Sequence, residues 1–282
     1  MDGIIIVDKE KEMTSHDVIN KLRKIFKTKK VGHCGTLDPE ATGVLVCLVN
    51  KATKLSNFLI LDSKEYLATF KLGIATTTQD LEGEIIEEVS YQNDCSIEKI
   101  KRVLEGFQGE IKQVPSIYSA IKVNGKKLYE YARNNEPVVI PERTITIHEI
   151  ELLALEDDLV SIRVNCSSGT YIRTLCYDIA RQLGYPGALV ELRRTKSGNF
   201  NIEDSSTLEQ IANNDYRLIK IIDALGDYDK VYLTDEQYED VRNGKPLSIT
   251  CQKPFVAVYD NEVQAIYDQA IEGIAKIKRG LW

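Results

Sequence analysis

The residues best suited to chemistry lie in one short stretch, residues 33–43, between apolar runs at residues 3–7 and 44–49. The stretch carries the carboxylate of Asp38, the imidazole of His33 and the hydroxyls of two threonines. Three glycines and a proline in and beside it predict a loop, because glycine tolerates positive φ and proline stops a β-ladder. A loop held between buried strands often presents catalytic side chains. A carboxylate placed there can act as a nucleophile or as a base.

Asp38 and His33 each have an ordinary structural interpretation as well. An aspartate before a proline often caps a turn through its side chain, which fits Asp38 followed by Pro39. A single histidine such as His33 is more often a buried structural residue than a functional one. The choice between the two interpretations therefore depends on the rest of the chain.

The segment before the loop predicts a strand followed by a helix. Residues 3–7 are β-branched and indicate a buried strand. Thr14 or Ser15 can cap a helix whose apolar residues recur at helical spacing up to Phe26. The end of this helix is strongly basic, which suits either a solvated helix end or a contact with phosphate groups. The basic residues are Arg23, Lys24, Lys27, Lys29 and Lys30.

Residues 112–143 have the composition of a mobile flap. Tyrosines alternate there with basic residues, and prolines bracket the segment. Basic side chains can meet phosphates and aromatic rings can meet unstacked bases, although an amphipathic helix after a turn fits the pattern equally well. The residues concerned are Tyr118, Lys122, Lys126, Lys127, Tyr129, Tyr131 and Arg133.

A second strand and helix follow the flap. Residues 159–166 alternate as a strand with one buried face, and a helix begins just after Gly169 and ends at Gly184. Arg173 falls in the first turn of this helix, where the helix dipole disfavours a cation. We therefore expect Arg173 to have an anionic partner elsewhere in the fold. Residues 188–196 predict another strand, which ends in positive charge.

Composition limits the class of protein. The chain has 282 residues with a net charge of −7, yet residues 1–60 hold 10 basic and 7 acidic side chains, so binding to RNA is neither required nor excluded. No apolar run approaches the roughly 20 residues of a membrane span, and the first residues do not resemble a signal peptide. Six cysteines without a Cys-x-x-Cys pair suggest reduced thiols in the cytoplasm, and three scattered histidines give little support for a metal site.

The predicted helices and strands become shorter from about residue 226. Short elements follow, with a helix at residues 234–242 and a hairpin of residues 255–259 and 263–267. We expect two domains, a large one over residues 1–225 and a small β-rich one over residues 226–282.

Several motifs together resemble the TruB family of bacterial tRNA pseudouridine synthases. Residues 32–43 fit the family pattern G-H-x-G-x-L-D-P-x-A-x-G. Five further stretches match in the same order, so the resemblance covers the chain from residue 3 to about residue 210. They are residues 64–66, 114–120, 125–133, 169–173 and 192–194. One departure is at residues 9–15, where the proline and glycine of the family's K-P-x-G-x-[TS]-S are both missing.

The resemblance implies an α+β fold, with a mixed and mostly antiparallel sheet flanked by helices and a small C-terminal PUA-like domain. It also implies that the chain isomerises uridine 55 in the T loop of tRNA to pseudouridine, with neither cofactor nor metal. The partner would be the T arm of tRNA, without a guide RNA or a membrane, and the enzyme would be a cytoplasmic monomer.

The resemblance also assigns the catalytic residues. Asp38 would be the catalytic aspartate, which attacks C1′, attacks C6 of the base or removes a ribose proton. Arg173 would pair with Asp38 and hold the carboxylate ionised and oriented. Tyr66 would stack on the uracil and manage the proton on C5. Tyr171 and Leu192 would line the pocket.

Extracting the uridine from a folded loop costs a few kcal/mol of stacking. His33 would occupy the vacated stack or hold the flipped base, while Lys126 and Arg133 of the flap would close over the T arm. Two other hypotheses remain: a non-catalytic RNA-binding or tRNA-chaperone protein, and a phosphotransferase that forms an aspartyl-phosphate. The first would not need Asp38 and Arg173 together, and the second usually needs another aspartate and a metal.

Overall fold

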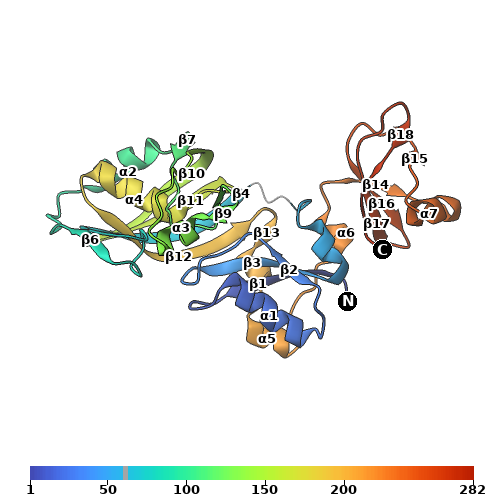
Figure 1. Ribbon diagram of the computed structural model, residues 1–282, viewed down its shortest axis with the longest axis horizontal. Coiled ribbons are helices and arrows are strands. Elements are labelled where there is room, and N and C mark those ends of the chain that lie inside the picture. Colours follow the sequence, from blue (N-terminus) through green and yellow to red (C-terminus); the bar gives the residue numbers. More distant parts are fainter. Residues whose placement is uncertain (60–62) are drawn as a thin grey trace. The chain divides into compact units, whose positions relative to one another are not determined.

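The computed structural model describes residues 1–59 and 63–282 and divides into two compact units (Figure 1). Unit 1 comprises Met1–Pro39, Val44–Ile60 and Ile202–Trp282, and unit 2 comprises Glu40–Gly43 and Leu61–Asn201. Both units contain helices and strands, as an α+β protein should. In the part of the chain that the structure describes, no helix has the length and apolarity of a membrane span.

Unit 2 is built on a sheet of long antiparallel strands. β4 pairs with β12 on one side and with β11 on the other, and β10 lies between β11 and β7. Thr42 and Gly43, the first residues of β3, pair in parallel with Arg193 and Arg194 of β12. The sheet is therefore mixed and mostly antiparallel, which confirms the prediction. Only these first two residues of β3 (Thr42–Val49) belong to unit 2. The other strands are β4 (Ser63–Leu72), β7 (Gly109–Gln113), β10 (Arg143–Glu156), β11 (Leu159–Ser167), β12 (Gly187–Ser197) and β13 (Phe200–Asn201).

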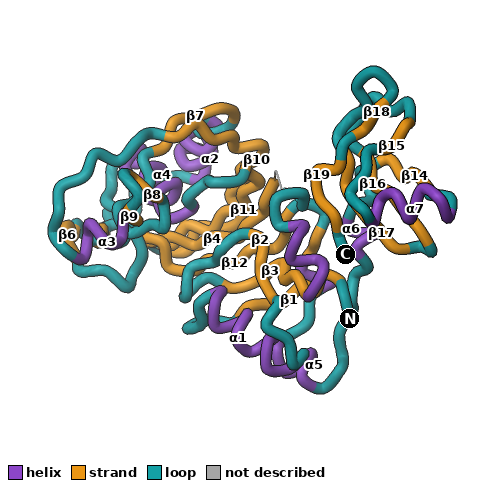
Figure 2. The backbone as a smooth tube through the Cα atoms, turned by 45° about the vertical axis from the view of Figure 1, so that its right-hand side comes forward, coloured by secondary structure: helices purple, strands orange, loops and turns teal. Residues whose placement is uncertain are grey.

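Helices α2 (Ile97–Glu105) and α4 (Ile172–Leu183) cover one face of this sheet (Figure 2). α4 packs on β12 and β4, and α2 packs on β10 and α4. The covered face is apolar because every second residue of a strand points to it, and on β11 the predicted alternation is confirmed by complete burial of Val160, Ile162 and Val164. α4 ends at Gly184, whose φ of 99° lies in the left-handed region that favours glycine.

The flap over residues 112–143 is a small hairpin followed by a short helix. β8 (Lys122–Val123) and β9 (Lys126–Lys127) pair through a turn at Asn124 and Gly125, and α3 (Leu128–Arg133) follows at once. The amide of Tyr129 donates to the carbonyl of Ser119, so the start of α3 is bonded to the segment before the hairpin. A second hairpin of unit 2 consists of β5 (Ile74–Thr76) and β6 (Ile85–Glu88).

In unit 1 the predicted N-terminal strand and helix are confirmed. β1 (Gly3–Lys9) leads to α1 (Ser15–Ile25), which Thr14 caps in a reciprocal arrangement with Asp17. The apolar face of α1 is buried against residues of β1 and β3. β2 (Val31–Cys34) pairs antiparallel with β3, and η1 (Asn50–Leu55) follows.

The predicted loop at residues 33–43 is shorter than expected. Gly32, His33 and Cys34 belong to β2, and β3 begins at Thr42. Only residues 35–41 therefore lie between the two strands. The error arose at Gly32, because a glycine can also occupy a strand when pairing satisfies its backbone, and Gly32 pairs with Leu48.

The C-terminal segment forms its own core around a four-stranded sheet of β14, β16, β17 and β19. The predicted helix becomes α7 (Asp235–Arg242), capped by Thr234, and the predicted hairpin becomes β16 (Phe255–Tyr259) and β17 (Glu262–Tyr267). The compact units place residues 202–282 together with the N-terminal residues, so a domain boundary after residue 225 stays a prediction. The remaining elements are η2 (Ile202–Asp204), α5 (Leu208–Ala212), α6 (Ile221–Ala224), β14 (Asp229–Tyr232), β15 (Leu247–Ser248), β18 (Ile274–Ala275) and β19 (Ile277–Gly280).

Candidate active site

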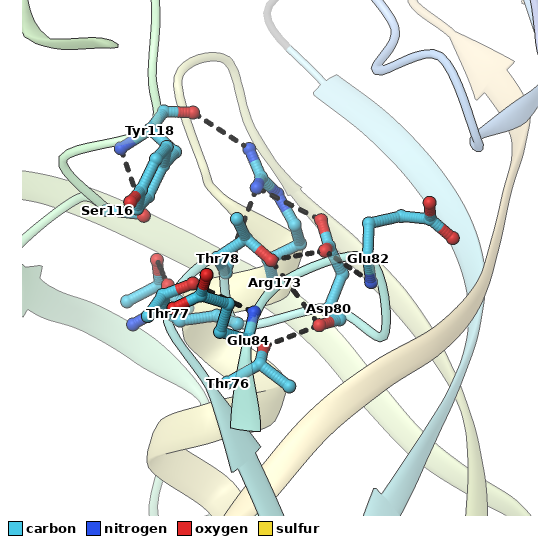
Figure 3. Close-up of polar contacts among 11 residues, drawn as sticks. Thr76, Thr77, Thr78, Asp80, Glu82, Glu84, Ser116, Tyr118 and Arg173 are labelled. Carbon is cyan, nitrogen blue, oxygen red and sulfur yellow. Dashed lines mark hydrogen bonds and ion pairs between the residues drawn. The ribbon is translucent and has the colours of Figure 1, made fainter. Parts of the chain in front are cut away.

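Arg173 is the centre of a polar cluster in unit 2 (Figure 3). Its Nη1 donates to the carbonyl of Thr78 at 3.0 Å and to Oδ2 of Asp80 at 3.1 Å, and its Nη2 donates to the carbonyl of Tyr118 at 3.2 Å. Arg173 is only 7% exposed. Asp80 is therefore an anionic partner of the kind expected for Arg173.

The loop between β5 and β6 holds Asp80 in place. Oδ1 of Asp80 accepts from the hydroxyl of Thr78 at 2.5 Å and from the amide of Glu82 at 3.2 Å. The hydroxyl of Thr76 donates to the Asp80 carbonyl, also at 2.5 Å. A carboxylate fixed on one oxygen by its own loop presents the other oxygen to Arg173, so the guanidinium is oriented by charge-assisted bonds.

Gln113 fixes Tyr171, the N-cap residue of α4. Its Oε1 accepts from the amide of Tyr171 at 2.9 Å, and its Nε2 donates to the Tyr171 carbonyl at 3.1 Å. Gln113 is buried at the end of β7, where the flap begins. The side chain thus ties the backbone of Tyr171, two residues before Arg173, to the base of the flap.

Tyr66 and Leu192 lie on one face of the sheet. Leu192 pairs with Ala68 and Arg194 pairs with Tyr66 across β12 and β4, so Leu192 and Tyr66 are diagonal neighbours, about 7–8 Å apart at Cα. Tyr66 and Ala68 are buried, whereas Leu67 between them is exposed, which places Tyr66 on the face that α4 covers. The structure therefore brings two predicted pocket residues together.

Asp38 and His33 belong to unit 1. Asp38 is exposed. It follows the buried Leu37 and precedes the exposed Pro39, whose carbonyl accepts from Nζ of Lys9 at 2.8 Å. His33 is half-buried on β2, opposite Cys47 of β3. Because Tyr66, Tyr171, Arg173 and Leu192 belong to unit 2, the pairing of Arg173 with Asp38 stays a prediction.

In the flap, basic side chains pack on tyrosine rings. Lys126 forms an ion pair with Glu136 at 2.5 Å and lies 4.7 Å from the ring centre of Tyr131. Arg133 lies 5.3 Å from the ring centre of Tyr129. The predicted alternation of tyrosines with basic residues thus appears as cation–π pairs within the flap.

The basic cluster at residues 23–30, in and after the last turn of α1, contains two kinds of residue. Arg23 is half-buried and donates to the carbonyl of Val31 at 3.2 Å, so it supports the fold. Lys24, Lys27, Lys29 and Lys30 are exposed. Arg23 therefore fits neither a solvated helix end nor a phosphate contact, whereas the exposed lysines fit both, and their contact with phosphate stays a prediction.

Burial raises the pKa of two titratable groups in unit 2. It raises the pKa of Asp178, on α4, to about 6 and that of the Cys166 thiol, on β11, to about 11. A thiol with a raised pKa is a poor nucleophile, so Cys166 is a structural residue. In residues 1–59 and 63–282, no group of three or more His, Cys, Asp or Glu side chains is placed to hold a metal ion.

Sequence reasoning missed Asp80 and Gln113. Neither residue was singled out from the sequence. Arg173 and Asp80 are 93 residues apart in the chain, and Gln113 and Tyr171 are 58 apart. The one available signal was the unfavourable position of Arg173 in its helix, which required an anion but could not say which of the many acidic residues supplies it.

Comparisons with known proteins agree on one family. Residues 23–172 match the family described as TruB family pseudouridylate synthase (N terminal domain), and residues 173–225 match the tRNA pseudouridylate synthase B C-terminal domain. The tRNA pseudouridine synthase B of Ligilactobacillus salivarius is 45% identical, with 95% of this chain and 94% of that protein covered. The protein of the same name from Bacillus cytotoxicus is 42% identical, with 95% and 92% covered.

Two solved structures share the fold. A chain of a Cbf5-Nop10-Gar1 complex superposes with a TM-score of 0.74 at 26% identity, over 99% of this chain and 85% of that chain. A chain of an H/ACA RNP bound to a substrate RNA containing 2'-deoxyuridine gives a TM-score of 0.73 at 25% identity, with the same coverage. The similarity therefore extends over the described length of both units.

Proposed function

Since the chain belongs to the TruB family of pseudouridylate synthases, we propose that it isomerises uridine 55 in the T loop of tRNA, with Asp38 as the essential catalytic residue. The observation that carries the proposal is the family match, which includes the whole stretch around Asp38. The relatives with 42–45% identity are named as tRNA pseudouridine synthases, and this supports tRNA as the substrate.

The reaction breaks the N1–C1′ bond of uridine, turns the base and forms a C5–C1′ bond. The proton on C5 is lost and N1 gains one, so the product is an isomer and no oxidant or reductant is consumed. Such a reaction needs a nucleophile or base at the nucleoside, and Asp38 supplies a carboxylate on an exposed loop. We expect no cofactor and no metal ion.

Arg173 is the proposed partner of Asp38. A guanidinium presents five N–H donors in a rigid fork, so one arginine can bind two carboxylates. Its bonds to Asp80, Thr78 and Tyr118 orient it before substrate arrives. In this proposal Asp80 holds the guanidinium of Arg173, and Arg173 in turn orients the carboxylate of Asp38. The charges are thus arranged before the reaction begins.

Tyr66, Leu192 and Tyr171 are the proposed lining of the uracil pocket. Tyr66 and Leu192 share one face of the sheet, and Gln113 fixes the backbone of Tyr171. We propose that Tyr66 stacks on the uracil and handles the C5 proton, and that His33 holds the base out of its stack.

The flap and the exposed lysines in and after the last turn of α1 are the proposed contacts with the RNA backbone. Lys126 and Arg133 lie on the flap beside tyrosines that can stack on bases. We further propose that the enzyme is a cytoplasmic monomer that acts on the T arm without a guide RNA.

The position of the modified uridine is tested by carbodiimide labelling followed by reverse transcription of an unmodified tRNA transcript incubated with the pure protein alone. The proposal predicts one new stop, at uridine 55, and none in a transcript with cytidine at that position. A stop elsewhere would overturn the choice of uridine, and a requirement for a second RNA would overturn guide-free action. A non-catalytic RNA chaperone would bind the transcript and give no stop.

A further inference from the structure

Ser15 binds the backbone of the residue that precedes Asp38. Its hydroxyl accepts from the amide of Leu37 at 2.9 Å and donates to the carbonyl of the same residue at 3.1 Å. Ser15 is 2% exposed and Leu37 is 4% exposed, so both bonds are shielded from water. One side chain thus satisfies both polar groups of one residue in a segment that belongs to no helix or strand.

The other side of Asp38 is bound by Lys9, the last residue of β1. Nζ of Lys9, which is fully buried, donates to the carbonyl of Pro39 at 2.8 Å and to the carbonyls of Glu10 and Met13 at 2.8 and 2.6 Å. Lys9 at the end of β1 and Ser15 at the start of α1 therefore hold the residues on both sides of Asp38. They do so although Glu12, with a φ of 61°, stands where the family usually has glycine.

Ser15 is not needed to cap its helix. Thr14 is the N-cap residue of α1, and its hydroxyl accepts from the amide of Asp17 at 3.1 Å. Ser15 follows as the first helical residue with its hydroxyl directed at Leu37. The two neighbouring hydroxyls thus have separate roles, one for the helix and one for the loop.

We infer that Ser15 is a positioning residue for catalysis, because its paired hydrogen bonds to Leu37 fix the backbone from which the Asp38 carboxylate projects. The inference rests on the proposed role of Asp38. An exposed carboxylate on an irregular loop keeps a defined position only if the neighbouring residues are fixed. A misplacement of about 1 Å at a reacting group can lower the rate about 100-fold. Loss of the Ser15 hydroxyl should therefore affect the chemical step more than tRNA binding.

The experiment compares Ser15→Ala with its matched control Thr14→Ala in single-turnover reactions at saturating tRNA. We expect Ser15→Ala to lower the rate of pseudouridine formation by about 10- to 100-fold with an unchanged Kd for tRNA. Thr14→Ala loses a helix cap and should lower the melting temperature while keeping the wild-type rate. Ser15→Thr keeps a hydroxyl and should restore most of the rate.

Wild type and Asp38→Asn are measured in parallel to separate the two proposals. Failure of wild type to react, or full activity of Asp38→Asn, would overturn the proposed function. A wild-type rate in folded Ser15→Ala, with Asp38→Asn inactive, would overturn the positioning role alone, as would an equal loss of rate in Thr14→Ala. If circular dichroism shows that Ser15→Ala does not fold, Ser15→Cys, which keeps the shape but weakens both bonds, decides by the same comparison.

Discussion

Nη1 of Arg173 lies 3.1 Å from Oδ2 of Asp80, and this ion pair joins the first turn of α4 to the loop between β5 and β6. The pair is largely shielded, since the side chains are 9% and 22% exposed. A buried cation needs such a partner, because an uncompensated charge in the interior costs several kcal/mol. The relationship explains why a positive residue can occupy the beginning of a helix.

Asp80→Asn should weaken both the fold and the reaction. Breaking a shielded pair by removing one charge costs about 3 kcal/mol, so urea unfolding should show a clearly lower free energy of unfolding. Because Arg173 is then less well oriented, we also expect a lower single-turnover rate. Glu82→Gln, an exposed acid two residues away, is the control for charge and should resemble wild type. Wild-type stability and rate in Asp80→Asn would show that the ion pair has no role in either.

The flap can be tested by releasing one of its cations. Lys126 is neutralised by Glu136 at 2.5 Å, so Glu136→Gln should make this lysine available to phosphate and tighten tRNA binding. Lys126→Ala and Arg133→Ala should weaken binding more than turnover at saturation, and each should reduce the slope of log Kd against log salt by up to about 1. Filter binding over a range of salt concentrations measures both quantities. Unchanged affinity and salt slope in all three variants would remove the flap from the list of phosphate contacts.

Gly43 marks a close approach between two backbones. A Cβ at this position would lie 2.2 Å from the carbonyl oxygen of Arg194, and the φ of Gly43 is 99°. Gly43→Ala should therefore lower the free energy of unfolding by more than about 3 kcal/mol, the sum of a clash and of backbone strain. Gly125→Ala is the control, since its φ of 81° carries strain but nothing lies within 4 Å of the added atom. Similar losses of stability in the two variants would contradict the close approach.

Replacing Asp178 should stabilise the protein by an amount that depends on pH. Burial raises the pKa of Asp178 in the folded protein to about 6, from 3.8, so ionisation opposes folding. This penalty is absent below pH 3.8, grows between pH 3.8 and pH 6, and is complete above pH 6. Asp178→Asn should thus raise the free energy of unfolding at pH 7.5 by about 1 kcal/mol, allowing for partial screening by solvent, and by much less at pH 4. An equal gain at both pH values would show that ionisation is not the cause.

Much of the fold was accessible from the sequence because its signals are local. The alternation in β11, the cap at Thr14 and the left-handed end at Gly184 each depend on a few neighbouring residues. The loop boundary at His33 was wrong because pairing with β3, which lies further along the chain, extends β2.

The site was accessible only in part. Asp38, Tyr66 and Arg173 are proposed from the resemblance, and the need of Arg173 for an anion followed from the helix dipole. Asp80, Gln113 and the bonds of Ser15 to Leu37 depend on contacts between residues 22 to 93 positions apart, for which a single sequence gives no distance information.

The central claim is that Asp38 catalyses formation of pseudouridine in tRNA, and release of tritium from C5-labelled uridine in an unmodified tRNA transcript tests it most directly. Wild type should release one equivalent of tritium per transcript without added cofactor or metal, in the presence of a chelator. Asp38→Asn should bind the same transcript and release none. Equal release by the two proteins would remove Asp38 from the mechanism, and no release by wild type would contradict the proposed function as a whole.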